Sequence, residues 1–398
     1  MLQPMRNIWS IKRNMSNSPK ATRGPRKKVF IGMSGGVDSS VSAALLVKAG
    51  YDVTGVFIKV WQPDRDISGL RCTWRDDRLD AMRVAALLGI PFITLDLESE
   101  YKKHVVDYMI EEYRRGRTPN PDVMCNKYVK FGGFFDWAMK KGADFVATGH
   151  YARTVKRTLD DGTITTDLVA GDDTNKDQSY FLWTLTQEQV SRTLFPVGDI
   201  EKPKVRELAR SFGLPTAEKK DSQGLCFIGK IDVKEFLAHY IPKERGNVLD
   251  THGAVIGSHD GSALFTIGER HGFIIDDRHK TPHDEPYYVV AKNIDDNTIT
   301  VSNTKAANCG VNTPVKGSLR IKLADVNWVR GVVPENGMTY HARPRYRAEL
   351  VDITVTQEKS NQIIVTFNEP QMTISPGQSL VIYDGAVCLG GGVIDSIV

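Results

Sequence analysis

A short loop rich in glycine and serine constrains the fold of this chain most strongly. The heptapeptide SGGVDSS, residues 34–40, separates a β-branched run over 28–31 from a helical pattern that runs from Val37 to Lys48 and ends at Gly50. Two glycines let the backbone turn without a Cβ clash, so the amides of the loop and of the helix N-terminus can face outward and bind an anion. The order strand, loop, helix therefore predicts a phosphate-binding site at one end of a sheet.

The loop differs from a Walker P-loop, because GxxxxGK[ST] is absent and no lysine follows the glycines. Asp38 is unexpected among phosphate ligands, since its carboxylate would repel them unless Mg²⁺ lies between. The heptapeptide resembles the SGGxDS loop of the N-type ATP pyrophosphatases, which adenylate a carbonyl oxygen and release diphosphate. GMP, NAD and argininosuccinate synthetases and several tRNA-modifying enzymes share it, so the loop alone does not select a substrate.

Strands and helices alternate through the first half of the chain. The pattern predicts a strand over 52–58, a helix over 76–88, a strand over 91–95, helix to about residue 115 and a buried strand over 145–147. This alternation is typical of a parallel sheet covered by helices on both faces. Glycine-rich turns follow from about residue 229. Short alternating runs then indicate an all-β barrel or sandwich (287–292, 298–301, 319–323, 362–367, 379–383).

We therefore expect an α/β fold in three parts. A Rossmann-like catalytic domain would span 28–228, a small connector 229–285 and a C-terminal all-β barrel 286–398. The length of 398 residues agrees with more than one hydrophobic core. The net charge of +4 permits a nucleic-acid partner without requiring one. No apolar run approaches the roughly 18 residues of a membrane span, so no membrane partner is expected.

The first 27 residues form a basic leader. No Asp or Glu occurs before Asp38, while lysine and arginine recur among Ser, Asn and Pro. This composition is typical of an organelle transit peptide, and we expect import into the mitochondrial matrix. The alternative is a disordered basic tail on a cytoplasmic protein.

Five scattered cysteines without a CxxC pair argue against a disulfide scaffold and a four-cysteine zinc site. Cys125 follows a proline-bounded turn, TPNPDVMC, which we expect to be a stiff loop. Lys127 would favour its thiolate, and Asp122 could transfer a proton. Cys226 stands in a glycine-flanked loop after two lysines. Neither setting is the apolar periodic run of a packing cysteine, so both are candidates for chemistry, whereas Cys72, Cys309 and Cys388 are candidates for packing.

Six segments carry a more specific resemblance. TPNPDVMCNKYVKFG, ATGHYAR, KDQSYFLW, KKDSQGLCFIG, FTIGERHGF and PGQSLVIYDGAVCLGGGVI occur in this order, and together they resemble the tRNA-specific 2-thiouridylases from Lys28 to the C-terminus. The resemblance implies a sulfurtransferase that uses ATP and Mg²⁺ to adenylate the C2 carbonyl oxygen of a tRNA wobble uridine. Sulfur from a cysteine persulfide, delivered by a sulfur-relay protein, would then replace the oxygen and give 2-thiouridine, AMP and diphosphate.

The resemblance also implies roles for individual residues. Cys226 would carry the persulfide, Cys125 would be its nucleophilic partner, and Asp122 would be an acid/base. In one scheme Cys125 attacks the Cys226 persulfide as sulfide is released, leaving a disulfide that must later be reduced. The ATP-binding residues would be Gly32, Met33, Ser34, Gly35, Gly36, Val37, Asp38, Ser39, Ile58 and Gly149, with Mg²⁺ held through Asp38. The tRNA-binding residues would be Asn120, Pro121, Asp122, Lys176, Asp177, Gln178, Arg345 and Tyr346.

Two positions depart from the family pattern: Glu269 stands where Gln is usual, and Ile58 where Met is frequent. His150 follows the nucleotide loop. It is either a phosphate contact or a loop histidine whose hydrogen bonds are satisfied within the protein.

Three alternatives remain open at this point. An adenylating amidotransferase or synthetase would not need Cys226. An RNA-binding module could retain an inactive loop. An iron-sulfur thiolase could ligate a cluster through Cys72, Cys125 and Cys226.

Overall fold

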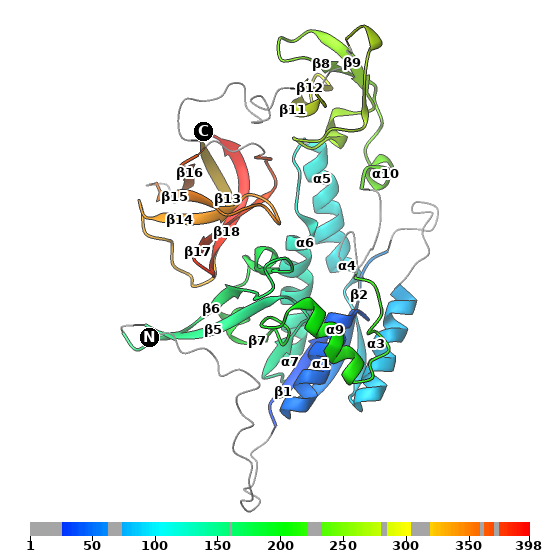
Figure 1. Ribbon diagram of the computed structural model, residues 1–398, viewed down its shortest axis with the longest axis vertical. Helices are drawn as coiled ribbons and strands as arrows, with labels where there is room; N and C mark the ends of the chain where they lie inside the picture. The colour runs from blue at the N-terminus through cyan, green and yellow to red at the C-terminus, as the bar shows by residue number, and fades with distance from the viewer. Residues whose placement is uncertain are drawn as a thin grey trace, which may run out of the picture.

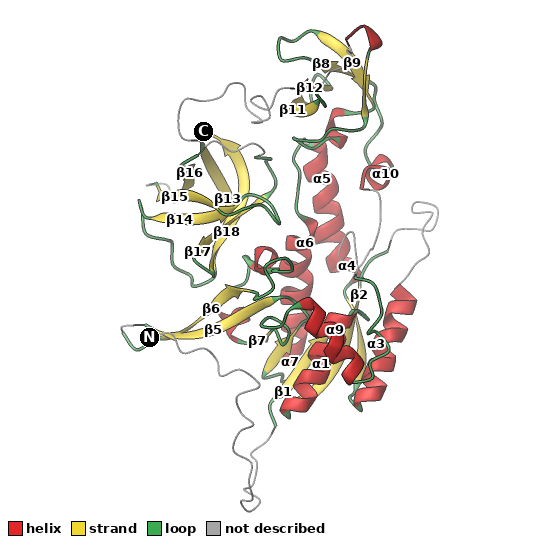
Figure 2. Cartoon of the chain, in the orientation of Figure 1, coloured by secondary structure: helices red, strands yellow, loops and turns green. Residues whose placement is uncertain are grey.

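A computed structural model describes most of the chain, and it consists of three bodies (Figure 1). The residues described are 26–62, 74–159, 161–221, 233–279, 285–303, 319–358, 362–369 and 374–398. Residues 1–25 of the leader, Cys72, Cys226 and Cys309 lie outside them. A body of parallel strands and helices forms one end, a small β-sheet forms the other, and a barrel lies beside the long helical column between them. Figure 2 shows that the long helices belong to the first body and that the barrel is built from strands.

The first body is a five-stranded parallel sheet with strand order β3-β2-β1-β4-β7. Its strands are β1 (Lys28–Gly32), β2 (Asp52–Lys59), β3 (Phe92–Asp96), β4 (Phe145–Ala147) and β7 (Thr193–Leu194). Successive side chains of β1 enter different cores. Val29 and Ile31 pack in the cluster shared with α1, α3 and α9, whereas Phe30 packs in the cluster shared with the helices after β3. Helices therefore cover both faces, as the sequence predicts.

The helices on the first of these faces are α1 (Val37–Ala49), α3 (Trp74–Leu88) and α9 (Lys202–Ser211). Gly50, at the C-cap of α1, has φ of 89°, and Gly89 after α3 has φ of 66°. Only glycine adopts this left-handed conformation without strain, which confirms the two helix ends expected from the sequence.

Two long helical segments cover the other face, and each contains a π-helical stretch. The first comprises α4 (Glu98–Tyr101), η2 (Lys102–Asp107) and α5 (Tyr108–Arg114), and the second α6 (Pro121–Met124), η3 (Cys125–Phe134) and α7 (Phe135–Lys140). The prediction of a stiff loop before Cys125 is wrong. Asn120 caps α6 by accepting a hydrogen bond from the Val123 amide at 3.2 Å, and Pro121 takes the first helical position, where no amide donor is needed.

An eight-stranded antiparallel sheet with strand order β13-β16-β15-β14-β17-β18-β6-β5 contains the barrel: an additional β13–β18 pairing closes the ring β13-β16-β15-β14-β17-β18, and β6 and β5 extend the sheet outside this ring. Its strands are β5 (Ala152–Thr158), β6 (Ile164–Ala170), β13 (Arg320–Trp328), β14 (Thr339–Arg343), β15 (Val351–Gln357), β16 (Ile363–Phe367), β17 (Ser379–Asp384) and β18 (Val387–Ile397). The barrel itself is confirmed. The β5–β6 hairpin comes from the first half of the chain and joins the barrel sheet through β18.

The small third body is a five-stranded sheet with strand order β10-β9-β8-β12-β11. Its elements are α10 (Val233–Ala238), β8 (Gly246–Leu249), β9 (Val255–His259), β10 (Phe273–Ile275), β11 (Tyr288–Asn293) and β12 (Thr298–Ser302). Because β12 pairs with β8, the predicted barrel start at residue 286 is wrong, and the connector extends at least through β12. The short helices of the chain are η4 (Ser179–Leu182), α8 (Gln187–Ser191), η5 (Ser262–Leu264) and η6 (Asp277–His279). None of the helices in the described ranges is both long enough and apolar enough to span a membrane.

Candidate functional site

A cavity of about 590 Å³ opens where the carboxyl ends of β1, β2 and β4 meet. Parallel strands place the loops after them at one edge of the sheet, which is the usual ligand site of such folds. The barrel contributes Tyr346 and Arg347 to the same cavity. The predicted site residues in its lining are Gly32, Met33, Ser34, Gly36, Val37, Asp38, Ser39, Ile58, Asp122, Gly149, Lys176, Gln178 and Tyr346.

Close packing explains two glycines of the predicted nucleotide site. Gly35 has φ of 75°, and a Cβ there would lie 2.2 Å from the Asp77 carbonyl oxygen. A Cβ on Gly149 would lie 2.7 Å from the Ser39 amide nitrogen. The loop after β4 can therefore approach the nucleotide loop only because Gly149 has no side chain.

Asp38 makes an ion pair that the sequence analysis did not anticipate. The Nζ atom of Lys202, at the start of α9, lies 2.7 and 2.8 Å from the two carboxylate oxygens of Asp38. The Tyr151 hydroxyl donates to Oδ1 of Asp38 at 2.7 Å. Burial, followed by the charge of Asp38, raises the pKa of Tyr151, so its hydroxyl stays protonated and donates. Both carboxylate oxygens are thus engaged, and direct coordination of Mg²⁺ by Asp38 does not fit this arrangement.

Lys202 also connects the nucleotide loop to Asp221. Its Nζ lies 2.9 Å from Oδ1 of Asp221. The same oxygen accepts a hydrogen bond from Arg206, and Oδ2 of Asp221 accepts one from Lys176, each at 2.7 Å. Partial burial alone would raise the pKa of Asp221. The hydrogen bonds and charges of Lys176 and Lys202 outweigh that effect and lower the pKa to about 2.

One face of the second helical segment lines the cavity. Asp122, Asn126 and Lys130 follow one another at intervals of four residues and all belong to the lining. A π-helical stretch inside a longer helix is frequently found at functional sites. Lys127, expected to favour the Cys125 thiolate, lies with its Nζ 5.1 Å from the centre of the Tyr128 ring and is not part of the lining.

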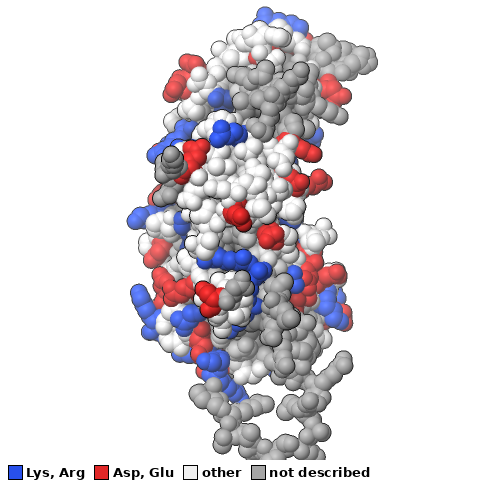
Figure 3. Space-filling view, turned by 90° about the vertical axis from the view of Figure 1, so that its left-hand side faces the viewer, with Lys and Arg blue, Asp and Glu red and all other residues white. Residues whose placement is uncertain are grey.

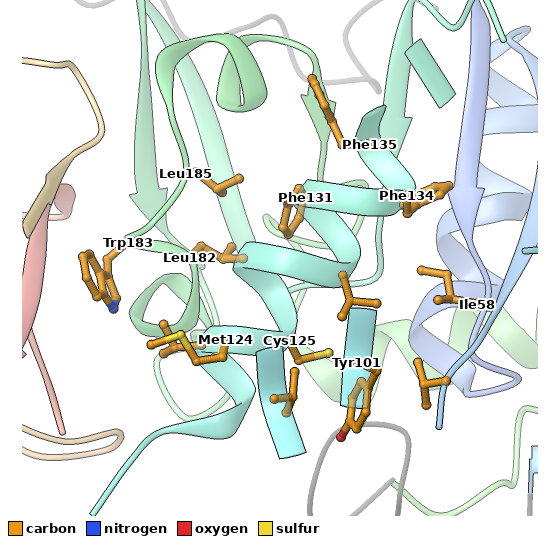
Figure 4. Close-up of a cluster of buried hydrophobic side chains, with 14 of the residues drawn as sticks. Ile58, Tyr101, Met124, Cys125, Phe131, Phe134, Phe135, Leu182, Trp183 and Leu185 are labelled. Atoms are coloured by element: carbon orange, nitrogen blue, oxygen red, sulfur yellow. The ribbon is translucent and has the colours of Figure 1, made fainter. Parts of the chain in front are cut away.

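Cys125 lies behind this face, fully buried in an apolar cluster. Figure 4 shows its side chain among Tyr101, Met124 and other apolar residues. The expectation that Cys125 lies outside a packing environment is therefore wrong for this conformation. The helix that starts at Pro121 explains the difference, because it turns Asp122 toward the cavity and Cys125 toward the core.

His150 is a satisfied loop histidine at the edge of the cavity. Its Nδ1 lies 2.7 Å from the Thr148 hydroxyl, and its Nε2 lies 3.3 Å from Nζ of Lys130. Burial, with a smaller contribution from the charge of Lys130, lowers the pKa of His150 well below its ordinary value. A neutral ring accepts from Lys130 at Nε2 and donates to Thr148 at Nδ1.

The predicted RNA-binding residues divide into two groups. Lys176, Gln178 and Tyr346 border the cavity, and the Tyr346 ring lies 4.4 Å from that of Phe181. Asp177, in contrast, is buried. Its carboxylate accepts from Arg343 at 2.9 Å and from the amides of Gly171 and Ser179. Its acceptor sites are therefore directed into the protein, away from a base.

The remaining predicted RNA contacts lie around the cavity without being part of its lining. Asn120 and Pro121 form the start of α6, and Arg345 is exposed. Arg347 belongs to the lining with φ of 62°, a left-handed conformation that is uncommon for a residue with a side chain. Figure 3 shows one face of the molecule, where lysine and arginine side chains form a compact group near the middle with acidic side chains around it.

Sequence reasoning missed Lys130, Lys202 and Arg347. Lys130 could have been found, because it lies eight residues after Asp122 on a helical repeat. Arg347 follows directly after a predicted contact. Lys202 has no local signal, since it reaches the loop from 164 residues further along the chain.

Comparisons with known proteins agree with this geometry. A family model described as "tRNA methyl transferase HUP domain" matches residues 27–230. The "tRNA methyl transferase PRC-barrel domain" matches 234–303, and the "Aminomethyltransferase beta-barrel domain" matches 318–394. The protein called tRNA-specific 2-thiouridylase MnmA in Staphylococcus saprophyticus is 46% identical over 370 residues, 93% of this chain and 95% of that protein. The chain belongs to the tRNA-specific 2-thiouridylase family.

Other 2-thiouridylases are equally similar. The Lactococcus lactis protein of the same name is 45% identical over 95% of this chain and 96% of its own length, and that of Shewanella oneidensis is 45% identical over 94% and 97%. A solved 4-thiouridine synthetase in complex with RNA and ATP shows a much weaker likeness. It is 20% identical, covers 54% of this chain and 50% of its own, and has a TM-score of 0.32.

The departure of this 2-thiouridylase from the family pattern at Glu269 has a structural counterpart. The Glu269 carboxylate pairs with Lys234 and accepts from the Thr266 amide at 3.0 Å. Burial lowers the pKa of the nearby Lys292 to about 8, and the negative charge of Glu269 acts in the opposite direction. The negative charge of Glu269 is thus paired with the positive charge of Lys234.

Proposed function

We propose that this protein is an ATP-dependent tRNA sulfurtransferase that converts a wobble uridine to 2-thiouridine. The observation that carries the proposal is the convergence of three groups on one cavity: the pyrophosphate loop, Asp122 of α6 and the aromatic side chain of Tyr346 of the barrel. A nucleotide and a flipped nucleobase can therefore be held within one space. Flipping a base out of its stack costs a few kcal/mol, which stacking on an aromatic side chain offsets.

The reaction that this arrangement supports has two stages. The uridine C2 oxygen attacks the α-phosphorus of ATP, the bond to the β-phosphate breaks, and diphosphate leaves. Sulfur then adds to C2, the carbon–oxygen bond breaks, and the oxygen departs with AMP. Adenylation is required because oxide is not a viable leaving group, whereas AMP is a stabilised phosphate.

Sulfur would come from a persulfide on Cys226, supplied by a donor protein. Attack by the Cys125 thiolate on Sγ of Cys226, the inner sulfur of the persulfide, would form the Cys125–Cys226 disulfide, break the bond to the terminal sulfur and expel that sulfur as sulfide, which adds to C2 of the uridine. Because Cys125 is fully buried, this step requires the start of η3 to move. Asp122 lines the cavity and would exchange the protons. Mg²⁺ would be carried by the ATP phosphates rather than by Asp38.

The test combines ATP, a tRNA transcript and a persulfide donor with the purified protein. Formation of AMP and of 2-thiouridine, measured by chromatography and mass spectrometry of nucleosides, is expected together. Asp38→Ala should abolish AMP formation, whereas Cys226→Ser should abolish 2-thiouridine and leave tRNA binding nearly intact.

No ATP consumption in the presence of RNA and sulfur would overturn the proposal. Thiolation by Cys226→Ser would overturn the persulfide assignment, and stoichiometric iron in anaerobically purified protein would favour an iron-sulfur cluster.

We also propose that the basic leader directs the protein to mitochondria. The support is its composition, which lacks acidic residues and repeats Arg, Lys and Ser. Residues 1–27 fused to a fluorescent protein should label mitochondria in eukaryotic cells. A diffuse cytoplasmic signal from that fusion would contradict this proposal.

A further inference from the structure

The nucleotide loop has no lysine of its own, yet a lysine is bonded to it in the structure. Lys202 is nearly buried, and its Nζ contacts both carboxylate oxygens of Asp38. Lys202 also lines the cavity. In a Walker loop the phosphate-binding lysine belongs to the loop itself. Here α9 supplies a cation to the equivalent place from far along the chain.

The surroundings of Lys202 hold its ammonium group in position. Asp38 and Asp221 accept from it on two sides, and its Nζ lies 5.8 Å from the centre of the Tyr151 ring. An ammonium group has three hydrogen-bond donors. Its contacts with the two oxygens of Asp38 and with Oδ1 of Asp221 match these three donors, so a phosphate bound by Lys202 would take the place of one carboxylate oxygen. The backbone amide of Lys202 is bonded to Asp173 at 3.0 Å, which fixes the start of the helix.

The same contacts argue against a metal ion on Asp38. A cation bound to that carboxylate would lie against the Lys202 ammonium, and like charges so close repel. In the part of the chain that the structure describes, no group of three or more His, Cys, Asp or Glu side chains could hold a metal ion. The positive charge that offsets Asp38 is therefore the lysine.

Three of the other four lysines that line the cavity contact groups outside the nucleotide loop. Lys176 binds Asp221, Lys219 binds Asp77 and Asp80 at 2.7 Å each, and Lys130 contacts His150. The fourth, Lys220, is exposed, whereas Lys202 is nearly buried against the loop.

We infer that Lys202 is the phosphate-binding lysine of this site and that Asp38 serves to orient it. The inference rests on the proposed function, because it requires ATP to be the ligand. In this arrangement the carboxylate of Asp38 does not face the phosphates unshielded. It holds the ammonium group that donates to them.

The test measures binding of MgATP and of adenosine to the full-length protein by calorimetry. Lys202→Met should weaken MgATP binding roughly 10- to 100-fold, as expected for a lost charge-assisted hydrogen bond, and leave adenosine binding unchanged. Lys202→Arg should retain most of the MgATP affinity. Lys204→Met is the matched control, since Lys204 lies on the same helix, is exposed and pairs with Glu207. It should bind both ligands as the wild type does.

The Asp38→Asn variant distinguishes this inference from a metal site at Asp38. It also provides a test if the Lys202→Met protein fails to fold. Asp38→Asn leaves Lys202 in place without the carboxylate that orients it, so this variant should weaken MgATP binding less than Lys202→Met does, and should weaken binding of ATP without Mg²⁺ by the same factor, although catalysis fails. Equal MgATP binding by folded Lys202→Met and wild type, or a loss of binding by Asp38→Asn that occurs only with Mg²⁺ present, would overturn the inference. A wild-type protein that binds no ATP would instead overturn the proposed function.

Discussion

Two buried cysteines, Cys125 and Cys388, differ in their positions relative to the cavity. Cys125 lies directly behind the helix face that carries Asp122 to the cavity. Cys388 lies on β18 and packs in the same large apolar cluster, where burial raises the pKa of its thiol above the ordinary value. A thiol that does not ionise is a poor nucleophile. Burial alone therefore does not distinguish the two cysteines, whereas their positions relative to the cavity-lining helix favour Cys125 as the proposed reacting cysteine.

This difference gives a residue-scale prediction. Cys125→Ser should abolish 2-thiouridine formation, while Cys388→Ser should retain it in proportion to the folded protein. Both substitutions bury a hydroxyl in an apolar core and should lower the free energy of unfolding by about 1–3 kcal/mol. Nucleoside mass spectrometry and urea denaturation measure the two effects. Thiolation by the Cys125→Ser protein would exclude Cys125 from sulfur transfer.

At the scale of single elements, the sequence predicted correctly the features that depend on interactions between neighbouring residues. Gly50 and Gly89 ended their helices as expected, because each adopts a left-handed conformation. The helix at Pro121 was mistaken for a loop, since proline disfavours a helix interior but suits the first turn. The β5–β6 hairpin was missed because its partner β18 lies more than 200 residues away. Contacts of that kind leave no periodic pattern in a single sequence.

The start of α6 provides the element-scale prediction. The Asn120 side chain accepts from the Val123 amide, and its hydrogen bond to the Tyr180 hydroxyl moderates the raised pKa of that buried phenol. Asn120→Ala should therefore lower the free energy of unfolding by about 1 kcal/mol, as for other helix caps. Asn120→Asp keeps an acceptor at the same place and should cost less. Equal urea midpoints for Asn120→Ala and wild type would show that the cap does not stabilise the helix that presents Asp122.

At the scale of the whole molecule, buried and partly buried ion pairs connect the barrel to the first body. Arg330 reaches the fully buried carboxylate of Asp167 at 2.6 Å, Arg343 reaches Asp177 at 2.9 Å, and Arg117 contacts Asp395 at 3.5 Å. Each pair joins positions more than 150 residues apart, so no motif could predict it. These contacts matter for the site because the barrel contributes Tyr346 and Arg347 to the cavity.

The pair of Arg343 and Asp177 carries the prediction at this scale. Asp177 stands between the cavity residues Lys176 and Gln178, and Arg343 precedes Tyr346 by three residues. Arg343→Met would leave a buried carboxylate without its cation, which should lower the free energy of unfolding by about 3 kcal/mol. Both segments that are proposed to bind RNA would lose their common anchor, so tRNA binding should weaken while adenosine binding persists.

Two variants distinguish this anchor from a direct RNA contact. Arg345→Met removes a neighbouring exposed arginine and should weaken tRNA binding without changing the free energy of unfolding. The double variant Arg343→Met/Asp177→Asn removes the buried charge together with its partner, and it should recover part of the lost stability. If Arg343→Met weakened tRNA binding but unfolded at the wild-type urea concentration, Arg343 would act on the RNA itself. The barrel would then be held in place by its other contacts, and the cavity would be assembled without this ion pair.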